Sequence, residues 1–119
     1  MKNYWRKGVY SFDNIRSSSF EFANEAFEFV KILEKENKEF EAIELMNHAP
    51  KILRILDSIE HESDIRKFRS GIQNAKSEIQ SSILALLHIY RDSDLKSEID
   101  VLVKKGQSLQ QVLTELLDR

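Results

Sequence analysis

The stretch IRKFRSGIQNAKSEIQSSILALLHIY, from Ile65 to Tyr90, decides the fold of this chain. Within it, aliphatic residues recur at every seventh position, and small or apolar residues fill the positions three further on. The two sets are Ile65, Ile72, Ile79 and Leu86, and Phe68, Ala75, Ser82 and Ile89. A seam of this kind, kept over about three and a half heptads, predicts a helix packed lengthwise against other helices.

Three further segments carry helical patterns, so the chain is predicted to be all-α. Beside a helix over about 65–91, we expect helices over about 20–37, 39–59 and from residue 95 onward. The last one repeats the seam, with Leu95, Leu102, Leu109 and Leu116 in one register and Ile99, Gly106 and Leu113 in the other. Short connections between helices favour an antiparallel, up-down-up-down four-helix bundle.

Local signals predict the helix ends and one irregularity. Side chains that can cap a helix N-terminus precede the first, third and fourth helices. They are Ser17, Ser18 or Ser19, then Ser63 or Asp64, then Ser93 or Asp94. Pro50 lies inside the second helix, where a proline removes a backbone donor, so we expect a kink near 46–49 or two abutting helices, and treat the segment as one kinked helix. Gly106 is expected to allow a bend or a close helix approach.

The first helix carries two neighbouring apolar stripes. One stripe is Phe20, Ala23, Phe27 and Val30, and the other is Phe22, Ala26, Phe29 and Leu33. An apolar surface this wide predicts that the helix is covered on more than one side.

Residues 1–16 are predicted to form an N-terminal arm, and residues 17–119 the bundle. The arm is rich in aromatic residues without helical period and contains Gly8. Its aromatic rings are expected to dock on the bundle or on a neighbouring subunit, since Trp and Tyr are common interface anchors. The alternative is that basic and aromatic residues of the arm bind nucleic acid by charge and stacking.

Composition narrows the class of protein. A chain of 119 residues with a net charge of −2 is expected to form one domain with no general attraction to nucleic acid. No apolar run approaches the ~20 residues that span a bilayer, so we expect no membrane segment. Cysteine is absent, which excludes disulfides and thiolate sites and suits the expected cytoplasmic location.

No group of residues predicts catalysis, so we expect no enzyme, cofactor or metal. Asp57, His61 and Asp64 have helical spacing, but the second helix should end between them. Glu44 and His48 are expected to form a surface pair at i and i+4. The Glu-x-x-His motif of di-iron bundles does not occur in the sequence. Glu78 falls near the seam edge and is expected to play a structural part, bonding to a helix or pairing with an arginine across a subunit interface.

Basic residues gather in two places, and with Trp5 they are the candidate contacts for nucleic acid or a protein partner. The full set is Lys2, Trp5, Arg6, Lys7, Arg66, Lys67 and Arg69. The last three lie in the first turns of the third helix, where the helix dipole disfavours positive charge. Either they pair with the acidic first helix of this or another chain, or they are simply solvated.

The run Asn14-Ile15-Arg16-Ser17-Ser18-Ser19-Phe20-Glu21-Phe22-Ala23 resembles the opening of bacterial four helix bundle proteins, the relatives of proteins encoded by intervening sequences in ribosomal RNA genes. Matching positions that follow are Phe29, Val30, Leu33, Lys38, Glu39 and Phe40, then Phe68, Ile72, Ala75, Glu78, Ser82 and Leu86. The resemblance implies an antiparallel bundle, often in a five-membered ring. Similar bundles are accessory proteins of diversity-generating reverse transcriptases.

Two functions are therefore expected. The first is a non-enzymatic, homo-oligomeric interaction or scaffold module, in a ring that the resemblance suggests is a pentamer. The second is a nucleic-acid-binding accessory protein that uses the basic residues of the arm and of the third helix.

Overall fold

A computed structural model describes residues 3–91 and 93–118. In these residues the structure contains four α-helices, one short 3₁₀ turn and no strand. The elements are η1 (Gly8–Tyr10), α1 (Phe12–Lys35), α2 (Glu39–Ser58), α3 (Ile65–His88) and α4 (Lys96–Leu117). The prediction of an all-α four-helix bundle is confirmed.

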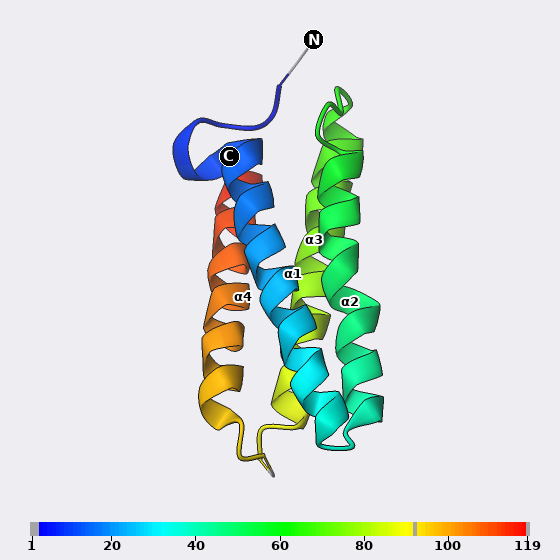
Figure 1. Ribbon diagram of the computed structural model, residues 1–119. Helices are drawn as coiled ribbons and strands as arrows, with labels where there is room; N and C mark the ends of the chain where they lie inside the picture. The colour runs from blue at the N-terminus through cyan, green and yellow to red at the C-terminus, as the bar shows by residue number, and fades with distance from the viewer. Residues whose placement is uncertain (1–2, 92, 119) are drawn as a thin grey trace.

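The helices lie side by side in an elongated bundle, 49 Å long and about 20 Å across. Figure 1 shows α1 running down from the arm to the turn at 36–38, and α2 returning beside it. α3 then runs down the bundle, and α4 returns in the opposite direction. None of the helices is both long enough and apolar enough to cross a membrane within the described residues.

The heptad seam of α3 forms the centre of the core. Of the eight predicted seam residues, seven are buried, and Ile65 is 45% exposed because it is the first residue of the helix. The α4 seam is buried from Ile99 to Leu116, while Leu95 precedes the helix and is half-buried. The period read from the sequence therefore identifies the buried face of both helices.

The predicted start of the first helix is wrong. α1 begins at Phe12, and Ser11 is its N-cap, with its hydroxyl accepting a hydrogen bond from the Asn14 amide at 3.2 Å. Asp13 adds a negative charge in the first turn, where the helix dipole favours it. Residues 17–19 lie inside the helix, and residues 12–16, predicted as part of the arm, form its first turns.

The other helix ends agree more closely with the sequence. Asp64 caps α3 and accepts a hydrogen bond from the Arg66 amide at 2.9 Å. α3 ends at His88, three residues before the predicted end. The N-cap of α4 is Leu95, which makes no side-chain capping bond, so the predicted cap at Ser93 or Asp94 is wrong. The Ser93 hydroxyl instead accepts a hydrogen bond from the Leu95 amide, just before the helix. α2 continues through Pro50 without interruption, so it is one helix, and the kink remains a prediction.

Two glycines allow neighbouring helices to approach closely. A Cβ at Gly106 would lie 3.0 Å from Cγ1 of Ile83 and 3.2 Å from a ring carbon of Phe22. A Cβ at Gly71 would lie 2.6 Å from Cγ2 of Ile59. Gly106 thus has the close contact expected from the sequence, and Gly71 has a closer one that the sequence did not indicate.

Candidate interaction surfaces

The arm, residues 3–11, is docked across one end of the bundle. The Tyr4 hydroxyl donates to the Ser63 carbonyl at 2.8 Å, and the Trp5 indole donates to the Glu60 carbonyl at 3.1 Å. The Trp5 ring also meets Phe12 and Phe68 edge-on, with centroids 5.0 and 5.1 Å away. The arm's aromatic residues therefore dock on the chain's own bundle, as one of the sequence interpretations predicted.

Trp5 is the chain's only tryptophan, so its fluorescence reports on the arm alone. Tyr4→Ala removes the bond to Ser63 and the ring contact with Phe68, and we expect the Trp5 emission maximum to shift to longer wavelength. Val9→Ala changes a 63% exposed side chain in the same segment and should leave the spectrum unchanged. Identical spectra for both variants would contradict the docked position.

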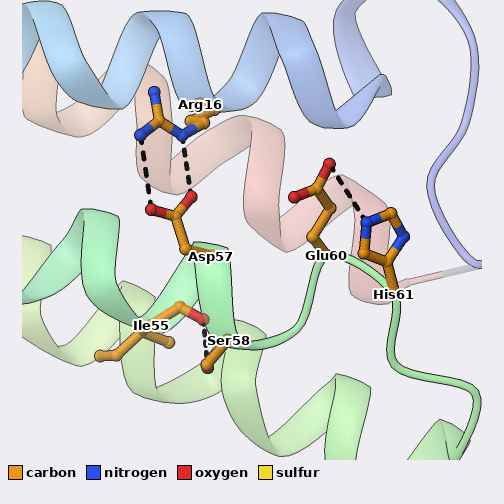
Figure 2. A network of polar contacts seen from close by, with 6 residues as sticks. All are labelled: Arg16, Ile55, Asp57, Ser58, Glu60 and His61. Carbon is orange, nitrogen blue, oxygen red and sulfur yellow. Dashed lines mark hydrogen bonds and ion pairs between the residues drawn. The ribbon is translucent and has the colours of Figure 1, made fainter.

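The same end of the bundle carries an interhelical ion pair. Figure 2 shows the Arg16 guanidinium facing the Asp57 carboxylate, with Nε–Oδ1 at 2.8 Å and Nη2–Oδ2 at 3.4 Å. The hydrogen bond to Asp57, more than its charge, raises the pKa of Arg16. A second, looser pair joins Glu60 to the neighbouring His61 at 3.7 Å. The pair shows that Arg16 of α1 lies level with Asp57 of α2.

The predicted basic contacts lie at this end but do not form one site. Lys2 is outside the described residues. Arg6 and Lys7 border a hollow that Glu60 and His61 also line, while Arg66 and Lys67 border a separate hollow between α2 and α3. Acidic residues of the same end are interspersed with them, namely Asp57, Glu60, Glu62, Asp64 and Asp118. The end therefore carries charges of both signs.

Two of the predicted contacts have structural partners inside the chain. Arg69 donates from Nη1 to the Leu117 carbonyl at 2.8 Å, which satisfies a free carbonyl at the end of α4. The Trp5 ring is half-buried in its contacts with the bundle. Stacking on a nucleobase would require the Trp5 ring to leave these contacts.

The acidic side of α1 pairs with Lys105 of α4 and not with a basic residue of α3. Its Nζ lies 2.6 Å from Glu25 and 2.9 Å from Glu21. Hydrogen bonds to Glu25 and then Glu21 raise the pKa of Lys105. The expected pairing of Arg66, Lys67 and Arg69 with the first helix of the same chain is not found among the described residues.

Glu78 bonds to a histidine of the neighbouring helix. Its Oε2 lies 2.6 Å from Nδ1 of His48, and both side chains are about one-quarter exposed, at 22% and 31%. Glu44 likewise pairs with His88 at 2.8 Å. The predicted Glu44–His48 surface pair is therefore wrong, because both side chains point across to α3. The sequence could not indicate this, since partners on different helices share no spacing.

A double-mutant cycle checks this assignment. The coupling between His48→Gln and Glu78→Gln is expected to be about 0.5–1 kcal/mol, since both variants break the same half-buried hydrogen bond. The coupling between His48→Gln and Glu44→Gln should be close to zero, because the two side chains have different partners. Urea denaturation of the wild type, the three single variants and the two double variants measures both couplings. The reverse order of couplings would contradict the structure.

An exposed apolar surface lies along the line where α1 and α2 meet, here called the α1/α2 face. It consists of Phe20, Ala23 and Phe27 of α1, and Ile43, Met46, Pro50 and Leu53 of α2. Phe20, Phe27 and Ile43 are 54%, 45% and 61% exposed. Of the first apolar stripe of α1, Phe20 and Phe27 thus remain exposed, while Ala23 is half-buried and Val30 is buried.

The position of these residues follows from the Arg16–Asp57 pair. Phe20, Ala23 and Phe27 follow Arg16 at helical spacing, and Leu53, Pro50 and Met46 precede Asp57 in the same way. Since α1 and α2 are joined by the turn at 36–38, Phe20 lies level with Leu53, and Phe27 with Met46. The seven residues of the α1/α2 face are uncharged, and Lys31 lies over one of them, with its Nζ 5.0 Å from the centroid of the Phe27 ring.

The described residues contain no group of three or more acidic or histidine side chains placed to hold a metal ion. The surface hollows are open and shallow, and three of them lie along the groove between α1 and α4. No family model, curated protein or solved structure matches the chain. The surfaces of the bundle are therefore the basis for inferring its function.

Proposed function

We propose that this protein is a non-enzymatic interaction module that assembles with further copies of itself. The exposed α1/α2 face carries the proposal. Three large apolar side chains there, Phe20, Phe27 and Ile43, are each about half exposed or more. Contiguous apolar surface of this kind is typical of protein interaction sites rather than of monomers.

The sequence pattern supports the same proposal. The two stripes of α1 predict a helix covered on more than one side, and the chain covers the stripe of Phe22, Ala26, Phe29 and Leu33. A second protein surface would cover the other. The resemblance to bacterial four helix bundle proteins extends the proposal to a ring, with five copies as the number to be tested.

Sedimentation velocity over about 1–100 µM tests self-assembly. We expect the mean mass to rise above the 14.0 kDa of one chain within this range. A mass that stays at one chain up to the highest concentration would contradict the proposal. The limiting mass at high concentration gives the number of copies, and so tests the five-membered ring.

A second candidate is a nucleic-acid-binding accessory protein. One observation favours it: the arm and the start of α3, which carry Arg6, Lys7, Arg66 and Lys67, lie at the same end of the bundle. Binding through these groups would weaken steeply with salt. Fluorescence polarization with labelled RNA and DNA at about 20 mM salt tests it, and no change in polarization would remove this candidate.

A further inference from the structure

We draw no further inference here: the strongest candidate, the apolar hollow between α1 and α4 that Glu25, Glu28 and Glu98 border, carries none, because Lys105 and Lys31 already pair with two of these carboxylates and nothing in the described residues shows what would cover it.

Discussion

Ile79→Ala is expected to lower the free energy of unfolding by about 2–5 kcal/mol, the usual cost of truncating a fully buried isoleucine. Ile79 is at the middle of the α3 seam and is 0% exposed, as are Ala75 and Ser82 one turn on either side. Neither of these two neighbours has a side chain long enough to fill the space that the truncation creates. The loss would be a large part of the ~5–15 kcal/mol that stabilises a domain.

Gln73→Ala is the control for this variant. Gln73 lies on α3 but is exposed, so its replacement should change the free energy of unfolding by about 0.5 kcal/mol or less. Thermal and urea denaturation followed by circular dichroism measure both. Equal melting temperatures for the two variants would mean that the α3 seam does not face the core.

Gly71→Val is expected to destabilise the protein by about 1–3 kcal/mol or more, the range for overpacking a close contact. The first added carbon would lie 2.6 Å from Cγ2 of Ile59, which is branched directly from the Ile59 Cβ. That methyl group cannot rotate away without moving the side chain as a whole. Ser70→Val adds the same β-branched side chain at an exposed position of α3 and serves as the control.

A compensating change tests the cause. Ile59→Ala removes the Cγ2 atom, so the double variant Gly71→Val with Ile59→Ala should lose less stability than the sum of the single losses. Additive losses in urea denaturation would show that the Gly71–Ile59 contact is not the source of the destabilisation.

The sequence predicts the fold well wherever a periodic pattern meets the core. The seams of α3 and α4 are predicted correctly because a helix that is buried on one side carries apolar residues at a regular spacing along its sequence. The start of α1 was missed because Ser17, Ser18 and Ser19 form a strong capping signal, although nothing prevents serines from lying inside a helix. The actual cap, Ser11, is a single serine in a stretch whose apolar residues show no helical spacing, so it gave no comparable signal.

The surfaces were harder to predict because they depend on which helices become neighbours. Glu44 and His48 satisfy the i and i+4 rule, yet their side chains bond to His88 and Glu78 of α3. The closeness of Gly71 to Ile59 is likewise a property of two packed helices. The wide apolar surface of α1 was visible in the sequence, but only the structure shows which of its two stripes remains exposed.

The groove between α1 and α4 has a consequence for local opening of the folded state. These two helices are bridged by the half-buried Lys105, and open hollows lie beside that bridge and further along the groove in both directions. α2 and α3, by contrast, share the close Gly71–Ile59 contact and two His–Glu bonds. In native-state hydrogen exchange, the amides of α4 should therefore exchange through a partial opening of lower free energy than those at the centres of α2 and α3. Raising the salt concentration should weaken the Lys105 bridge and widen that difference.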